Sequence, residues 1–422
     1  MKKISLFSLC LITFLLSCKE TEPLEETTQE YQKLTVNSSS DFFYSDPNGN
    51  ASTGTAFLSN EKGEVLQQLE LSNNTSTEFD MDFSTHSSFD FTYLNSRTIT
   101  YADGKVVKRY FLSTFKDVAP HQFELQHSEK VEEDIRANVQ IINTAGNIQN
   151  ITTSNTVYKN ILNSFANIEV RLNNSEEDIY ISFLASGEEV PRYVLHQNVE
   201  NGFSTTHELA NLPLAKDKFI IDHSQLEYCF TYIYGSFSDN PREFNSLLSY
   251  SKEFTKPNSS VHYIPLNEFA QIKTYTETSK GEKYYRTTEI GNSIQTNYEL
   301  PAFDFEVINS EVENYEIMPS GDFQYYRITL YFRNSLENYQ IQWSQYGKYT
   351  DGSIKLDLPD ILNSIAAETA GLSINEFELY HTFLFKVQGM DSYMEFNNLM
   401  LNPSATLEST SDKIELVYTV DQ

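Results

Sequence analysis

The side chains that hydrolases use occur in this sequence without the spacing that hydrolysis requires. A serine nucleophile on a strand-to-helix elbow follows the pattern Gly-x-Ser-x-Gly, which the 422 residues do not contain. A helical zinc site follows His-Glu-x-x-His, but His207-Glu208 is followed by Leu209-Ala210-Asn211 and lacks the second histidine. Phosphate-cradling and dinucleotide-binding motifs are also missing from the sequence. These patterns predict no catalytic residue and no cofactor.

Acidic side chains are the most abundant chemical resource of the chain. A glycosidase needs only two carboxylates on opposite sides of a sugar, and 59 acidic residues supply many such pairs without singling one out. Asp80 and Asp82 fall on one face of an expected strand and are weak candidates for a cation site. Charge that protects an exposed strand edge from aggregation explains the same two residues, and we favour that interpretation.

Aromatic side chains provide a second candidate site. Tyr339 and Trp343 alternate along one face of an expected strand, and Tyr346 and Tyr349 follow in the expected loop before Asp351-Gly352. An exposed group of this kind could stack on sugar rings, so these four residues are weak candidates for glycan binding. Packing in a hydrophobic core is the commoner fate of alternating aromatic residues.

The N-terminus predicts export and lipid attachment. Lys2 and Lys3 precede an apolar run over residues 4–16, which is too short to span a bilayer because a spanning helix needs about 20 residues. A charged start with a short apolar stretch is typical of a secretory signal peptide. The stretch ends in Leu15-Leu16-Ser17-Cys18, which resembles the lipobox of bacterial lipoproteins, although Leu16 is bulkier than the small residue commonest at its position.

This resemblance implies cleavage before Cys18 and attachment of fatty acyl chains, such as palmitate, to that residue. Several acyl chains hold a protein stably on a membrane, whereas a single chain does so only marginally. The acidic stretch after Cys18 is similar to the surface-export signal of Bacteroidota-type lipoproteins, and a solvated linker explains it equally well. We therefore expect an outer-membrane protein on a lipid anchor, and the resemblance to the export signal implies a position at the cell surface.

Charge and cysteine content exclude several classes of protein. The formal net charge is −29, and loss of residues 1–17 with their two lysines would make it −31. Such a molecule repels the phosphates of nucleic acids and of anionic lipids, so we expect no nucleic-acid partner and membrane attachment through Cys18 alone. Three cysteines cannot form a disulfide framework. Cys229 lies in a strand-like run and is expected to be buried and inert.

Alternating side chains and glycine turns predict an all-β fold of tandem β-sandwiches. In residues 323–332 and 226–234, every second side chain shares a face, so each run can turn one face towards a core. Asp103-Gly104 is a favoured hairpin connection, and Gly63 occupies a similar place earlier. Turn glycines recur about every 41 residues up to Gly187, which keeps a β-propeller as the alternative fold.

The expected organisation is a signal peptide (1–17), a lipidated acidic linker (18–34) and three β regions. The first β region, 35–128, resembles an immunoglobulin-like, carboxypeptidase-regulatory-like sandwich in its hairpin pattern. A middle region covers 136–300, and a C-terminal β domain covers 302–422 with one short helix near 358–370. We expect a non-catalytic protein that binds a ligand or glycan, or that mediates adhesion. A structural partner in an envelope complex and a carboxylate-dependent glycan hydrolase remain the alternatives.

Overall fold

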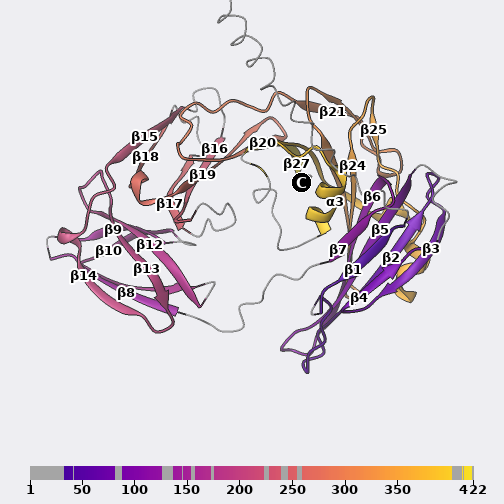
Figure 1. The fold of residues 1–422 in the computed structure, drawn as a ribbon, viewed down its shortest axis with the longest axis horizontal. Coiled ribbons are helices and arrows are strands. Elements are labelled where there is room, and N and C mark those ends of the chain that lie inside the picture. The colour runs from indigo at the N-terminus through magenta and orange to yellow at the C-terminus, as the bar shows by residue number, and fades with distance from the viewer. Residues whose placement is uncertain are drawn as a thin grey trace, which may run out of the picture. The chain divides into compact units, whose positions relative to one another are not determined.

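The computed structural model describes residues 33–40, 42–80, 88–125, 136–144, 146–153, 157–172, 175–222, 228–238, 246–253, 259–401, 411 and 413–420. Strands dominate these residues, as the all-β prediction requires. The first seven strands form two facing sheets, with strand orders β4-β1-β7 and β3-β2-β5-β6 (Figure 1). They are β1 (Thr35–Ser38), β2 (Ala51–Ser59), β3 (Val65–Leu71), β4 (Thr75–Glu78), β5 (Phe89–Thr100), β6 (Val106–Val118) and β7 (Gln122–Leu125).

The first sandwich follows the expected local pattern. Gly63 and Gly104 have φ angles of +76° and +82° and close the β2–β3 and β5–β6 hairpins, so both predicted turns are confirmed. Val36 on one sheet and Phe91 on the other belong to the same buried apolar cluster. Burial of that shared face is what holds the two sheets together.

The next seven strands repeat this topology strand for strand. Their sheets have the orders β11-β8-β14 and β10-β9-β12-β13, and β14 runs parallel to β8 just as β7 runs parallel to β1. The strands are β8 (Arg136–Ile142), β9 (Ile148–Thr152), β10 (Val157–Asn163), β11 (Phe165–Arg171), β12 (Glu176–Ala185), β13 (Arg192–Glu200) and β14 (Ser204–Glu208). A short 3-10 turn, η1 (Leu209–Asn211), follows.

The third sandwich has the same order but only part of its seventh strand. Its sheets are β15-β18 and β17-β16-β19-β20, and the place of the seventh strand holds only a parallel bridge between Asp222 and Asn297. The elements are β15 (Asp217–Asp222), β16 (Tyr228–Ser236), β17 (Ser246–Glu253), β18 (Ser259–Ile264), η2 (Leu266–Glu268), β19 (Gln271–Lys280) and β20 (Lys283–Gly291). Residues 136–300, expected as one middle region, thus contain the second and third sandwiches.

The last sandwich carries the α-helices of the described residues. Its sheets have the orders β21-β22-β25 and β27-β26-β23-β24. The strands are β21 (Asp304–Asn309), β22 (Glu316–Ser320), β23 (Tyr325–Asn334), β24 (Tyr339–Lys348), β25 (Ile354–Lys355), β26 (Glu378–Val387) and β27 (Lys413–Val420). The helices are η3 (Val312–Asn314), α2 (Leu362–Ile365), η4 (Ala367–Thr369), η5 (Ile374–Glu376) and α3 (Tyr393–Leu401).

The helix expected near 358–370 is much shorter than predicted. Only Leu362–Ile365 is α-helical, and the 3-10 turn η4 follows it after one extended residue, Ala366. The Thr369 side chain explains the break, because its hydroxyl donates to the Leu362 and Ala366 carbonyls and so offers the backbone an alternative to a continued helix. The longest α-helix of the described residues is α3, which the sequence analysis did not predict.

Three of the four sandwiches share one continuous sheet of twelve strands. Strand β20 pairs antiparallel with β27, and β24 pairs parallel with β6, so the sheet passes from the third sandwich through the fourth to the first (Figure 1). The propeller alternative is wrong, because the strands form facing sheets that continue from one repeat into another rather than separate blades.

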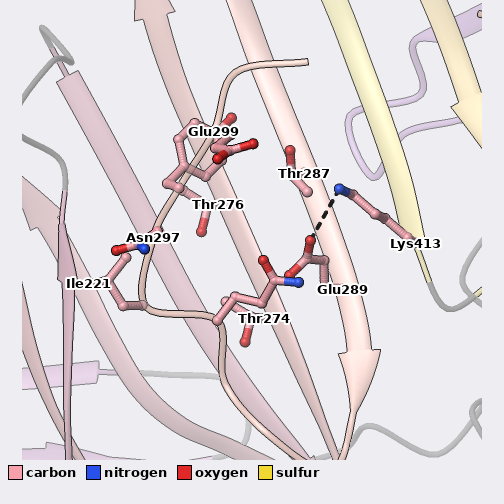
Figure 2. A pocket seen from close by; sticks show the side chains of 10 residues that line it. Ile221, Thr274, Thr276, Thr287, Glu289, Asn297, Glu299 and Lys413 are labelled. Atoms are coloured by element: carbon pink, nitrogen blue, oxygen red, sulfur yellow. Dashed lines mark ion pairs between the residues drawn. The ribbon is translucent and has the colours of Figure 1, made fainter. Parts of the chain in front are cut away.

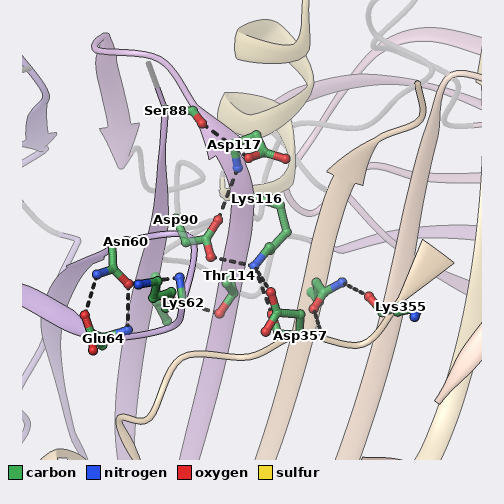
Figure 3. Close-up of polar contacts among 12 residues, drawn as sticks. Asn60, Lys62, Glu64, Ser88, Asp90, Thr114, Lys116, Asp117, Lys355 and Asp357 are labelled. Carbon is green, nitrogen blue, oxygen red and sulfur yellow. Dashed lines mark hydrogen bonds and ion pairs between the residues drawn. The ribbon is translucent and has the colours of Figure 1, made fainter. Parts of the chain in front are cut away.

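A buried ion pair stands at the junction of the first and fourth sandwiches (Figure 3). The Lys116 ammonium on β6 lies 2.5 Å from the Asp90 carboxylate on β5 and 2.9 Å from Asp357, which follows β25. The side chains of Lys116 and Asp90 are only 12% and 2% exposed. Burial raises the pKa of Asp90, and the charge of Lys116 opposes that rise. The pair therefore ties the fourth sandwich to a carboxylate inside the first.

Candidate functional site

The sheet of the third sandwich is unusual because its aromatic face points away from the sandwich core. On β16, Cys229, Thr231 and Ile233 are buried against the partner sheet. The alternate residues Phe230, Tyr232 and Tyr234 are only partly buried. Cys229 is buried as predicted, and burial raises its pKa to about 12, which disfavours the reactive thiolate.

These aromatic rings form a continuous group across neighbouring strands. The ring centroid of Tyr232 lies 6.2 Å from those of Phe230 and Tyr234 along β16. It lies 5.0 Å from Tyr250 on β17 and 5.7 Å from Tyr275 on β19. We call these five residues the aromatic face. None of the five belongs to the buried apolar clusters of the described residues.

A rigid polar cluster borders the aromatic face. Oε2 of Glu277 accepts hydrogen bonds from Nε and Nη2 of Arg286, at 3.0 and 2.8 Å, and from the hydroxyls of Tyr275 and Tyr418, each at 2.8 Å. The guanidinium also lies 4.9 Å from the Tyr275 ring and 5.4 Å from the Tyr418 ring. Burial raises the pKa of both tyrosines well above its ordinary value. Their hydroxyls therefore remain protonated and act as donors.

The opposite face of the same strands lines a polar cavity of about 260 Å³ (Figure 2). Hydroxyls come from Thr274 and Thr276 on β19 and from Thr287 on β20. The other lining residues, from β15, β20, the segment after β20 and β27, are Ile221, Glu289, Gln295, Asn297, Tyr298, Glu299 and Lys413. The cavity lies where the seventh strand is reduced to the Asp222–Asn297 bridge. Small threonines and a missing strand together leave the space unfilled.

Charges in the cavity are arranged around Lys413. Its ammonium lies 3.4 Å from carboxylate oxygens of both Glu289 and Glu415. Burial raises the pKa of Glu289, and Lys413 opposes that rise. Burial also disfavours the charged form of Lys413, but Glu415 and Glu289 outweigh it and raise the lysine pKa. Lys413 therefore stays charged at neutral pH, and its contact with Glu289 fits a binding role better than proton transfer to a substrate.

The four aromatic residues proposed from sequence do not form a surface patch. Tyr339, Trp343 and Tyr346 are 3%, 1% and 6% exposed, so a sugar ring cannot stack on them. Trp343 donates from Nε1 to Thr114 Oγ1 at 2.8 Å inside the core. Tyr349 is half-buried and stacks on Phe323 at 4.4 Å. The strand through Tyr339 and Trp343 was predicted correctly, but Tyr346, expected in the loop after it, also lies within β24. Aromatic side chains on both faces of β24 are buried.

Of the two candidate cation residues, the structure describes only Asp80. Asp80 is exposed at the end of the segment that follows β4, while Asp82 and the lipidation candidate Cys18 lie outside the described residues. Within the described part of the chain, no three His, Cys, Asp or Glu residues are grouped closely enough to hold a metal ion.

Sequence reasoning missed both the aromatic face and the cavity. The available signal was β19, where Thr274 and Thr276 alternate with Tyr275 and Glu277. That pattern establishes two chemically distinct faces but not which of them is buried. The choice depends on which face the partner strands β15 and β18 cover.

No protein-family model matches this chain, and no curated protein matches it. Among solved structures, the Escherichia coli alpha-2-macroglobulin activated by porcine elastase aligns over 74% of this chain and 38% of its own length. The identity is 8% and the TM-score is 0.11. This chain thus spans well under two thirds of that protein, and a TM-score this low does not establish a shared fold. None of the described helices combines the length and the apolar character needed to cross a bilayer.

Proposed function

We propose that this chain is a non-catalytic, lipid-anchored envelope protein that captures glycan on the aromatic face of the third sandwich. The observation that carries the proposal is the group of five aromatic rings around Tyr232, turned away from the core. Grouped aromatic residues outside a core cost free energy in water, and such patches commonly mark binding sites. Sugar rings present flat C–H surfaces that suit this kind of group.

The polar rim supports a hydroxyl-rich ligand over a purely apolar one. Lys273 lies 4.9 Å from the Tyr234 ring, and the Glu277–Arg286 pair borders Tyr275 on the other side. Tyrosine hydroxyls and these charged groups can bond to sugar hydroxyls while the rings stack beneath. A face of five aromatic residues on three strands suits an extended chain of sugars rather than one residue.

The proposed location is the outer membrane, with Cys18 as the lipidated residue and the β-sandwiches carried by the acidic linker. The motif at Cys18 and the strongly negative charge support this arrangement. The protein would then hold polymer near the membrane without cleaving it. A role as an assembly partner would use the same face for protein contact instead.

The test replaces the central ring. Tyr232→Ser should weaken binding of soluble polysaccharides, measured by affinity electrophoresis or calorimetry, by about tenfold, which corresponds to roughly 1.4 kcal/mol. Tyr44→Ser is the matched control, because Tyr44 is 41% exposed and lies in the first sandwich, away from the aromatic face. Equal binding by Tyr232→Ser and the parent would overturn the proposal. A stoichiometric protein partner that Tyr232→Ser loses, with no polysaccharide bound by the parent, would favour the assembly role.

A further inference from the structure

We propose that the cavity between β19, β20, β27 and the segment after β20 binds one neutral, polyhydroxylated small molecule of the size of a single sugar ring. This site is separate from the proposed glycan surface. Thr274 and Thr276 face the cavity, whereas Tyr275 and Glu277 on the same strand face the opposite side. The two sites can therefore be changed independently.

The cavity contains a buried hydroxyl whose hydrogen bonding is incomplete. Thr287 is 7% exposed, and among the described residues its Oγ1 meets no partner at normal hydrogen-bond geometry, although the Tyr298 hydroxyl interacts with it. An unsatisfied buried polar group costs about 1–3 kcal/mol. A ligand hydroxyl in the cavity would supply the missing partner.

Threonine is also an unexpected choice at these positions. On β12, which occupies the equivalent place in the second sandwich, the core face carries Ile179, Ile181 and Phe183. On β19 the corresponding face carries threonines that are also buried, with Thr274 and Thr276 8% and 3% exposed. Aliphatic residues would fill the space and contribute apolar burial, so packing alone does not account for hydroxyls here.

The lining chemistry selects the class of ligand. Glu289, Glu299 and Lys413 give the lining a net charge of −1, and the adjacent Glu415 makes the surroundings more negative, which disfavours an anion. A metal cation would be repelled by the Lys413 ammonium. An apolar ligand would leave hydroxyls, amides and carboxylates without partners. Neutral molecules with many hydroxyls satisfy all of these groups.

The volume selects the size. Pockets for drug-sized ligands measure about 300–1,000 Å³. A cavity of about 260 Å³ falls just below that range. One sugar ring or cyclic polyol is therefore a better match than an oligosaccharide.

The first test uses ligand-observed NMR with the full protein body and a panel of glucose, galactose, mannose, N-acetylglucosamine and myo-inositol. At least one neutral member should bind, and Thr287→Val should weaken it about tenfold, which corresponds to roughly 1.4 kcal/mol. Valine has nearly the shape of threonine, so the fold should persist, and loss of an unsatisfied hydroxyl should leave the unfolding temperature unchanged or raised. Thr276→Leu, which fills the cavity, should abolish binding.

Charged analogues and the aromatic-face variant complete the design. Glucosamine and galacturonate should bind more weakly than their neutral counterparts, and Tyr232→Ser should leave small-molecule binding unchanged. The inference is overturned if no neutral member binds, if a charged analogue binds better, or if Thr287→Val and Thr276→Leu bind like the parent. Loss of polymer binding in Tyr232→Ser alone would concern the aromatic face and leave this cavity site unaffected.

Discussion

Removal of the Lys116 ammonium should destabilise the junction of the first and fourth sandwiches. Lys116→Met keeps an unbranched apolar stem of similar length and deletes the charge together with the hydrogen bonds that the ammonium donates to Asp90 and Asp357. Asp90, 2% exposed, would then retain a single hydrogen bond, from the Asp117 backbone N–H at 3.2 Å. Breaking one side of a buried ion pair costs about 3–5 kcal/mol, because the remaining charge is uncompensated.

The exposed partner contributes little to this cost. Asp357 is 54% exposed, and surface pairs are worth roughly 0–1 kcal/mol. The matched control is Lys386→Met, because Lys386 pairs at 2.6 Å with Asp322, which is 86% exposed. We expect that control to lose less than about 1 kcal/mol.

The lone tryptophan gives a local assay for the same junction. Trp343 on β24 bonds to Thr114, two residues before Lys116 on β6, so its fluorescence in a urea titration reports where the two sandwiches join. The double variant Asp90→Asn with Lys116→Met should recover much of the loss, because no buried charge remains.

The pH dependence supplies an independent check. Without Lys116 the folded-state pKa of Asp90 should rise further above the ordinary value of an aspartate. The folded variant would then bind more protons than the unfolded chain, so the deficit should shrink as the pH falls towards the folded-state pKa. A loss no larger than that of Lys386→Met, or a double variant as unstable as the single one, would refute the reasoning.

Three further perturbations test other parts of the molecule. Burial lowers the pKa of His196, and His207, whose Nε2 lies 3.0 Å from His196 Nε2, lowers it further, so the neutral form is favoured in the folded protein. The stability of the second sandwich should therefore fall as the pH drops below about 6.5. His207→Gln should flatten this pH profile in urea titrations. Phe396→Ala removes a fully buried ring stacked 4.2 Å from Tyr325, and should lower the free energy of unfolding by about 3–5 kcal/mol; a change below 1 kcal/mol would contradict the packing of α3. Cys18→Ala should abolish labelling with palmitate and shift the protein from the membrane to the soluble fraction, and unchanged partitioning would remove the proposed anchor.

Local patterns predicted strands and turns well because they depend on neighbouring residues. The alternation in residues 323–332 and the turn at Gly104 both correspond to observed elements. Helix α3 escaped prediction because its burial depends on distant strands. Its Phe396 packs against Tyr325 on β23 and against Tyr346 on β24. No local pattern reports such contacts.

The candidate site was missed for a related reason. Tyr339 and Trp343 share one face of β24, as Phe230, Tyr232 and Tyr234 share one face of β16, and Tyr346 lies on the opposite face of β24; yet the first three are buried and the group around Tyr232 faces away from its core. The difference lies in what covers each strand. On β24, Trp343 packs in one buried cluster with Ile361 and Leu362, and Tyr346 packs against Phe396 of α3 on the other face. The outer-face aromatic residues of β16 belong to no buried apolar cluster of the described residues.

The two proposed sites of the third sandwich follow from one structural change. When the seventh strand is reduced to a bridge, the inner face of β19 and β20 loses part of its cover, and polar side chains become tolerable there because a cavity rather than a packed core lies above them. The aromatic residues on the outer face of this sheet do not contribute to the sandwich core. The pairing of β20 with β27 extends the sheet into the fourth sandwich. It places Lys413 of β27 at the cavity and Tyr418 of β27 on the opposite face, beside Glu277. A one-residue slip between β20 and β27 would exchange these two side chains' faces, so the register of this strand pair determines which of the two sites each of them borders.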